Sequence, residues 1–103
     1  YVADKIQDYV LDLVTATRRP REFGLGLEAL IAHGASPRAT LFLVRGAQAL
    51  AVLEGRSYVL PEDVKAIALD VLRHRIHVSY EAEAEGVDGE ELARRILEKV
   101  RVP

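Results

Sequence analysis

The sequence of 103 residues contains no cysteine, no methionine and no tryptophan. Without cysteine the chain can form neither a disulfide framework nor a thiolate metal site, so an apolar core must hold the fold together. Half of its residues are apolar, and a chain of this length buries roughly two thirds of the surface that its unfolded form exposes, which is enough for one domain. Because no methionine is present to start translation, we expect the chain to be a fragment of a longer polypeptide.

The sequence also lacks long apolar runs and a strong excess of one charge. Its longest apolar run, Ala49–Leu53, is far shorter than the ~20 residues that cross a bilayer, so we expect no membrane span and a cytoplasmic protein. The chain has 14 basic and 16 acidic residues, which are interleaved except at Arg18, Arg19 and Arg21. Nonspecific nucleic-acid binding depends on clustered Lys and Arg, so no nucleic-acid partner is expected.

Apolar residues recur at helical spacing in four segments: residues 2–17, 36–55, 61–75 and 88–100. Residues that favour helix ends stand at their boundaries. Ser36 and Asp88 are good N-caps, Pro61 suits a first helical position and a glycine at position 55 suits the end of a helix. Residues 20–35 contain three glycines and a proline, and are predicted to be a loop with one helical turn. The pattern predicts an all-α fold, either a four-helix bundle or an orthogonal helical array.

Two further features bear on how these helices pack. Segment 36–55 has almost no polar face, so we expect it to form the centre of the bundle, with Leu50 buried and Leu50→Ala costing ~2 to 5 kcal/mol. Tyr58–Val59 and Ile76–Val78 flank the third helical segment and could form one very short antiparallel pair, although both segments are short for strands. Glu81–Glu85 is expected to be an exposed turn or a short helix.

Motifs for catalysis are absent from the chain. It contains no Gly-x-x-x-x-Gly-Lys-Ser/Thr phosphate loop, no His-Glu-x-x-His zinc motif and no Gly-x-Ser-x-Gly nucleophile motif. His74 and His77 stand three residues apart, but the sequence places no third metal ligand near them. We therefore expect the isolated chain to be no enzyme and to hold no metal.

Arg38 occupies a position that conflicts with local electrostatics. It is expected at the second position of a helix, where the helix dipole already makes the environment positive and favours an acidic side chain. A bound anion would reverse the balance, because the helix N-terminus offers N–H donors and the guanidinium offers a two-pronged contact to phosphate oxygens. Ser36-Pro37-Arg38 thus has the composition of half a phosphate site. The residues alone leave it equally open that Arg38 extends into solvent.

Several motifs in register resemble one known family. They are Gly34–Thr40, Gly55–Lys65 and Asp70–Ile76, followed by Ser79–Ala82. In order and spacing they are similar to the C-terminal lid domain of MoxR-type AAA+ ATPases, over nearly the whole chain. The resemblance implies that residues 1–103 form an all-helical lid that follows a nucleotide-binding core upstream of Tyr1. The chain departs from the family at Leu60, where Ser or Thr is frequent, and this departure weakens the N-cap of the third helix.

The resemblance also implies roles for particular residues. Arg38 would be the second-sensor arginine that acts on bound ATP, with Ser36 and Pro37 beside the phosphates. Tyr9 and Val10 would lie on the adenine side. The cofactor would be ATP with magnesium, bound by the full-length protein and not by the isolated fragment.

The same resemblance implies a chaperone-like ATPase as the parent protein. Its subunits would form a hexameric ring, in which the lid couples nucleotide state to subunit arrangement. The implied partners are the upstream AAA+ core domain, the neighbouring subunits and proteins with von Willebrand factor A domains.

Two alternatives remain open on the residues alone. A small helical protein-interaction or DNA-binding module would use Arg18, Arg19 and Arg21, and would bind duplex DNA in a salt-dependent way. A purely structural bundle would instead associate with itself, which sedimentation of the chain would detect.

Overall fold

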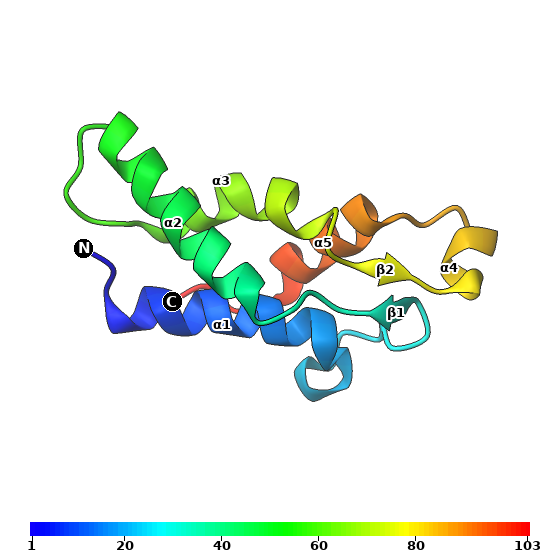
Figure 1. Cartoon of the computed structure of the whole chain (residues 1–103). Coiled ribbons are helices and arrows are strands. Elements are labelled where there is room, and N and C mark those ends of the chain that lie inside the picture. Colours follow the sequence, from blue (N-terminus) through cyan, green and yellow to red (C-terminus); the bar gives the residue numbers. More distant parts are fainter.

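The computed structural model describes residues 1–103 as five α-helices, one 3-10 helix and two short strands (Figure 1). In chain order these are α1 (Asp4–Arg18), η1 (Pro20–Phe23), β1 (Ile31–His33), α2 (Arg38–Leu53), α3 (Pro61–Leu72), β2 (His77–Val78), α4 (Tyr80–Ala84) and α5 (Gly89–Lys99). The all-α fold class is confirmed, and the four long helices occupy the four predicted segments. None of the helices combines the length and the apolar character that crossing a membrane requires.

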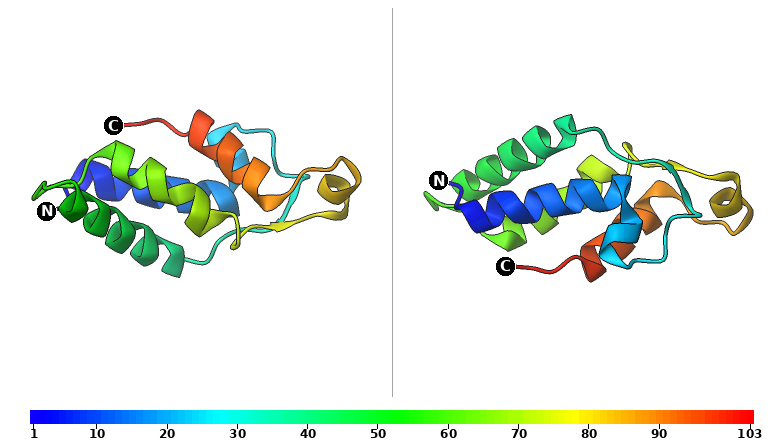
Figure 2. Two further views of the ribbon diagram at one scale, coloured as in Figure 1. Left: turned by 90° about the horizontal axis from the view of Figure 1, so that it is seen from above. Right: turned by 90° about the horizontal axis from the view of Figure 1, so that it is seen from below.

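The long helices form an elongated bundle that measures 44 × 23 × 21 Å. Helices α1 and α3 contact each other in the middle and separate α2 from α5. Both views in Figure 2 place α2 and α5 at opposite edges, while the strands and α4 extend from one end. The buried apolar side chains form one cluster of 23 residues, so the chain has a single core.

The N-cap of α3, which Leu60 was expected to weaken, is supported by a buried carboxylate. Leu60 has no side-chain oxygen to cap the helix, and its own N–H donates to Asp63 Oδ2 at 2.8 Å. Arg56, from the loop before the helix, donates to the other carboxylate oxygen of Asp63. Burial alone would raise the pKa of the Asp63 carboxyl, but the Leu60 N–H and the Arg56 guanidinium together lower that pKa below its usual value. The buried carboxylate therefore fastens the α2–α3 loop to the start of α3.

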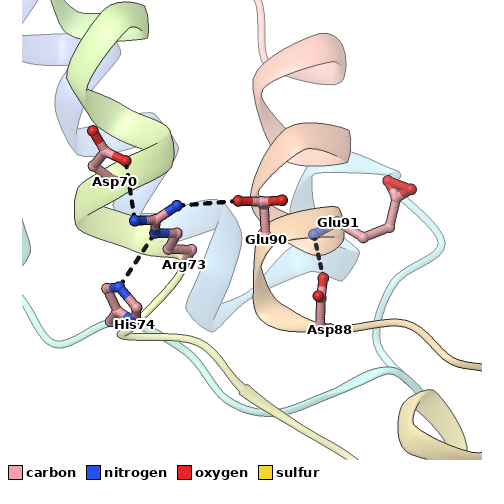
Figure 3. A network of polar contacts seen from close by, with 6 residues as sticks. All are labelled: Asp70, Arg73, His74, Asp88, Glu90 and Glu91. Atoms are coloured by element: carbon pink, nitrogen blue, oxygen red, sulfur yellow. Dashed lines mark hydrogen bonds and ion pairs between the residues drawn. The ribbon is translucent and has the colours of Figure 1, made fainter.

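Helices α3 and α5 are joined by a close backbone contact and by a polar network (Figure 3). A Cβ at Gly89 would lie 2.5 Å from the Arg73 carbonyl oxygen, so the start of α5 approaches the end of α3 as only glycine allows. Arg73 contacts Asp70 on its own helix at 3.5 Å and Glu90 on α5 at 3.2 Å. Asp88 caps α5, as predicted, by accepting the Glu91 N–H at 2.9 Å.

The short two-stranded pair exists, but the predicted partner of Ile76–Val78 is wrong. Strand β2 pairs antiparallel with β1, which lies in the segment predicted to be a loop with one helical turn. That helical turn is present as η1. The predicted strand Tyr58–Val59 is held elsewhere, because the Val59 N–H donates to the Tyr1 carbonyl at 2.9 Å.

The prediction that α2 forms the centre of the bundle, with Leu50 buried, is also wrong. Leu50 is only half-buried. The inward face of α2 consists mainly of small residues, with Ala39, Ala47 and Ala51 around Leu43. Most of its larger apolar side chains point outward instead. The spacing of apolar residues shows how much apolar surface a helix has, but not which side chains are large. It therefore could not predict that α2 packs with its small residues and lies at the edge of the bundle.

Truncation of Leu43 tests this corrected position of α2. Leu43 is fully buried, so Leu43→Ala should lower the free energy of unfolding by ~2 to 5 kcal/mol through lost contacts and the cavity left behind. Leu50→Ala removes the same atoms from a half-buried site of the same helix and should cost clearly less. Urea denaturation of the two variants measures the difference. Equal losses of unfolding free energy would mean that Leu50 is buried as deeply as Leu43.

The environment of Asp63 predicts a specific dependence of stability on pH. Its pKa is lower in the folded than in the unfolded chain, so the carboxylate stabilises the fold above the ordinary carboxyl pKa. That contribution is lost as the pH falls through the lowered folded-state pKa. Asp63→Asn should therefore reduce the loss of stability between about pH 5 and pH 2, as followed by denaturation midpoints. An unchanged acid dependence in this variant would show that Asp63 is not the responsible group.

Candidate functional site

Arg38 is the first residue of α2 and lies exposed at the surface of the bundle. The first turn of the helix contains no acidic residue, and Arg38 takes part in none of the ion pairs of the structure. Ser36 and Pro37, which precede it, are exposed as well. The structure therefore brings the three residues of the predicted phosphate site together on one accessible helix end.

The backbone donors at this helix end already have acceptors. The Arg38 N–H donates to Ser36 Oγ at 3.3 Å, and the Ala39 N–H donates to the Ser36 carbonyl at 2.9 Å. The Thr40 N–H donates to the Pro37 carbonyl at 3.1 Å. The guanidinium of Arg38 is therefore the main group with free donors at this place, and an anion would be bound chiefly by the side chain.

The loop that leads into α2 is fixed by the last turn of α1. Thr17, which is buried, donates to the Val14 carbonyl at 2.6 Å and accepts the Ala35 N–H at 2.9 Å. A Cβ at Gly34 would overlap the Thr17 carbonyl group and lie 2.6 Å from the Arg18 nitrogen. Residues 34–35 thus lie directly on the α1 backbone, and this contact sets where α2 begins and where the backbone of Arg38 lies.

Thr17 and Gly34 are positioning residues that sequence reasoning missed. Gly34 begins the motif Gly34–Thr40, but nothing in the sequence identifies the helix that it touches. Thr17 gave one signal, because a polar side chain lies among the inward apolar residues of α1. A buried hydroxyl needs a hydrogen-bond partner. The position of Thr17 could therefore have predicted a contact with another segment of the chain.

Tyr9 and Val10 are buried in the core of the bundle. The Tyr9 hydroxyl is buried without a hydrogen-bond partner, and burial raises the pKa of this phenol. The structure gives both residues a packing role. Their place on the adenine side of a nucleotide stays a prediction.

The arginine cluster at the end of α1 lines a shallow hollow of about 340 Å³. Arg18, Arg19 and Arg21 share this hollow with Glu28, and Arg19 lies 4.0 Å from Glu22. The two acidic side chains interrupt the basic surface. The hollow therefore lacks the continuous stripe of cations with which proteins follow a nucleic-acid backbone.

The histidines do not form a metal site with other ligands. His74 accepts the Arg73 Nε–H at 3.2 Å, whereas the His77 ring lies against His33 across the strand pair, with ring centroids 6.3 Å apart. No group of three or more His, Asp or Glu side chains is arranged to hold a metal ion.

A family model for the AAA lid domain matches residues 27–96, which include both strands, α2, α3 and most of α5. The chain belongs to this family, as a lid of the MoxR type. The resemblance stated from the sequence motifs is thereby confirmed. The match includes Arg38 and its preceding loop.

Named relatives extend the match to the whole chain. Chaperone MoxR1 of Mycobacterium tuberculosis is 40% identical over 104 residues, which cover 100% of this chain and 28% of that protein. Protein MoxR of Paracoccus denitrificans is 45% identical over 84 residues, which cover 77% of this chain and 25% of that protein. The crystal structure of a proposed ATPase from Cytophaga hutchinsonii matches with a TM-score of 0.94 at 46% identity, covering 99% of this chain and 31% of that one. The chain thus spans less than a third of the length of these proteins.

Substitution of Gly34 tests how the start of α2 is held. Gly34→Ala should lower the free energy of unfolding of the lid by about 1 to 3 kcal/mol, because the new Cβ meets rigid backbone atoms of α1. Gly46→Ala is a matched control. There the Cβ meets only the flexible tip of Ile67, and alanine is the better helix former, so the cost should be smaller. Urea denaturation compares the two, and an equal or larger loss at Gly46 would contradict the contact.

Proposed function

We propose that this domain is the lid of a MoxR-type AAA+ ATPase and that Arg38 is its second-sensor arginine, which contacts the phosphates of bound ATP. One observation supports this role above others. Arg38 stands at a helix N-terminus, exposed and without any ion pair, where a cation is unfavourable until an anion arrives. A phosphate supplies that anion and matches the planar guanidinium in geometry.

ATP with magnesium is the proposed cofactor of the full-length protein. Arg38 and the Ser36 hydroxyl suit the phosphate part of this ligand, because they are accessible and lie on one helix end. No acidic side chain stands in the first turn of α2, so this helix end offers the metal ion no carboxylate, and we expect residues of the upstream core to hold it. The lid by itself would therefore bind ATP weakly and hydrolyse none.

The proposed mechanism uses the rigid connection between Arg38 and the bundle. Because residues 34–35 lie on the backbone of α1, Arg38 moves with the lid as one body. When the lid turns toward the nucleotide, the guanidinium meets the γ-phosphate and stabilises the charge that develops during phosphoryl transfer. The position of the lid then depends on the nucleotide, and the arrangement of the subunits depends on the position of the lid.

The assembly in which this occurs is proposed on the same basis. A lid of this family would act in a hexameric ring of a chaperone-like cytoplasmic ATPase, next to its own core domain and to neighbouring subunits. Proteins with von Willebrand factor A domains are the proposed external partners. The relative named Chaperone MoxR1 supports the chaperone-like role.

Substitution of Arg38 separates activity from stability. In the full-length ATPase, Arg38→Ala should slow ATP hydrolysis at least about tenfold, because the transition state loses a charge-assisted contact. Arg38→Lys should restore only part of the rate, since an ammonium keeps the charge without the two-pronged geometry. Steady-state hydrolysis at saturating ATP measures both.

The same substitution should leave the lid folded. Removing a cation from a helix N-terminus should change the free energy of unfolding by only tenths of a kcal/mol, in the stabilising direction. Arg21→Ala, which removes another exposed arginine, is the matched control and should leave hydrolysis unchanged. If Arg38→Ala unfolds the lid while the rate per folded molecule stays at the wild-type value, Arg38 is a structural residue.

A further inference from the structure

His33 and His77 stand opposite each other on the strand pair that extends from one end of the bundle (Figure 1). The antiparallel register places Ile31 opposite Val78 and His33 opposite His77. An unbroken register would place Ile76 opposite His33, so an extra residue in β1, a β-bulge, brings the two histidines together. Their rings meet edge to face, with centroids 6.3 Å apart.

The ring nitrogens of both histidines are free for a ligand. Neither ring takes part in a side-chain hydrogen bond or an ion pair of the structure, and both residues are exposed. His74 differs, because it accepts the Arg73 Nε–H at 3.2 Å. An uncharged imidazole has one nitrogen lone pair, so His33 and His77 together offer two nitrogen ligands at one place.

The surroundings of the two rings favour a cation. His33 and His77 line one hollow of about 380 Å³, together with Ser79, Tyr80 and Glu83. No lysine or arginine lines this hollow, and Glu83 adds a carboxylate to it. A positive ion is therefore attracted to the hollow and meets no opposing charge there.

The separation of the rings suits a single metal ion between them. Zinc binds imidazole nitrogen at about 2.0 to 2.1 Å. Two imidazoles on one tetrahedral ion have ring centres roughly 5 Å apart, so rotation of the side chains must draw these rings together by about 1 Å. Exposed side chains change rotamer readily, so this adjustment requires no movement of the strands.

We propose that His33 and His77 chelate one divalent transition-metal ion of the zinc class. Water fills the other positions of the ion, because no third His, Asp or Glu side chain is arranged to bind it. Imidazole suits zinc, copper and nickel, whereas magnesium prefers oxygen ligands, so this site is separate from the magnesium that is proposed to accompany ATP.

This site replaces the expectation that the chain holds no metal. The sequence paired His77 with His74, its neighbour three positions away. The partner of His77 is instead His33, which lies 44 residues earlier in the chain and faces it only through the bulge. A pattern of metal ligands that are close in sequence could not have revealed it.

A bound ion would connect the two strands of the arm, which consists of β1, β2 and α4. The strands have only three and two residues, and a pair this short is marginally stable. Ser79 supplies further links, because its hydroxyl donates to the Ala29 carbonyl at 2.6 Å and its N–H donates to the Leu30 carbonyl at 3.0 Å. A metal ion that binds only the paired strands stabilises the arm further.

Isothermal titration of zinc chloride into the full-length protein tests the site. The protein is purified without a histidine tag, and excess magnesium chloride occupies sites built from oxygen ligands. We expect one zinc ion to bind in the micromolar range, and His33→Gln or His77→Gln to weaken this binding at least about tenfold. His74→Gln is the matched control and should leave the affinity unchanged, because His74 lies outside the pair.

Hydrogen exchange with mass spectrometry gives a second, local measurement. Zinc should slow exchange in peptides that contain residues 29–33 and 77–80 of the wild-type protein, but not in the His77→Gln variant. Unchanged exchange in peptides of α1 and α3 shows that the variant is folded.

Three results would overturn the proposal. Zinc affinity that is unchanged in both His33→Gln and His77→Gln would place the ion elsewhere, as would an equal loss in His74→Gln. Binding only at millimolar zinc would mean that the two rings act as ordinary surface histidines. Equal slowing of exchange in the wild-type protein and in His77→Gln would mean that zinc does not connect the strands.

Discussion

The contact between Gly34 and the last turn of α1 is the constraint on which the proposed site depends. No side chain other than hydrogen fits between residue 34 and the Thr17 backbone, and the buried Thr17 hydroxyl takes the next N–H of the loop. These two interactions fix the point at which the chain turns into α2. Arg38 follows three residues after Ala35, so its backbone has a fixed place relative to the bundle. The role proposed for Arg38 would need such a rigid base, because a small displacement would remove a contact with the phosphate.

The periodicity of the sequence predicted the four long helices, and residues at several of their ends predicted where these helices begin or end. The predicted N-cap Ser36 is one residue early, because Pro37 occupies the N-cap position of α2. Pro61, Asp88 and the glycine at position 55 signal these ends through local backbone chemistry, which is readable from a few neighbouring residues. Strand β1 was missed because it forms only where Ser79 donates to the Ala29 carbonyl and β2 lies alongside, contacts between segments about 50 residues apart. The misplacement of α2 has a different cause. The apolar spacing of residues 36–55 does not distinguish the small residues, which let α2 approach its neighbours closely, from the large ones, which remain exposed.

The candidate site also consists of residues that the sequence predicts and residues that only the structure reveals. Arg38 could be found from the sequence, because its conflict with the helix dipole is a local property. Thr17 and Gly34 could not be paired, because their contact joins positions 17 residues apart through the packing of two helices. Tyr9 and Val10 lie on the inward face of α1, where the apolar spacing of that segment already favoured packing over ligand contact.

Arg38 and the exposed apolar residues Val52 and Leu53 are unfavourable features of α2 when the lid is considered alone. The arginine opposes the helix dipole, and Val52 and Leu53 are left in water. Under the proposed function, a bound phosphate would supply the anion that the position of Arg38 lacks. If ATP and the proposed core domain both contact the lid, their binding free energies are linked and the effect is reciprocal: ATP would strengthen the contact between lid and core by the same factor by which that contact strengthens ATP binding. The proposed coupling would then need no change inside the bundle, because the lid would move as one body.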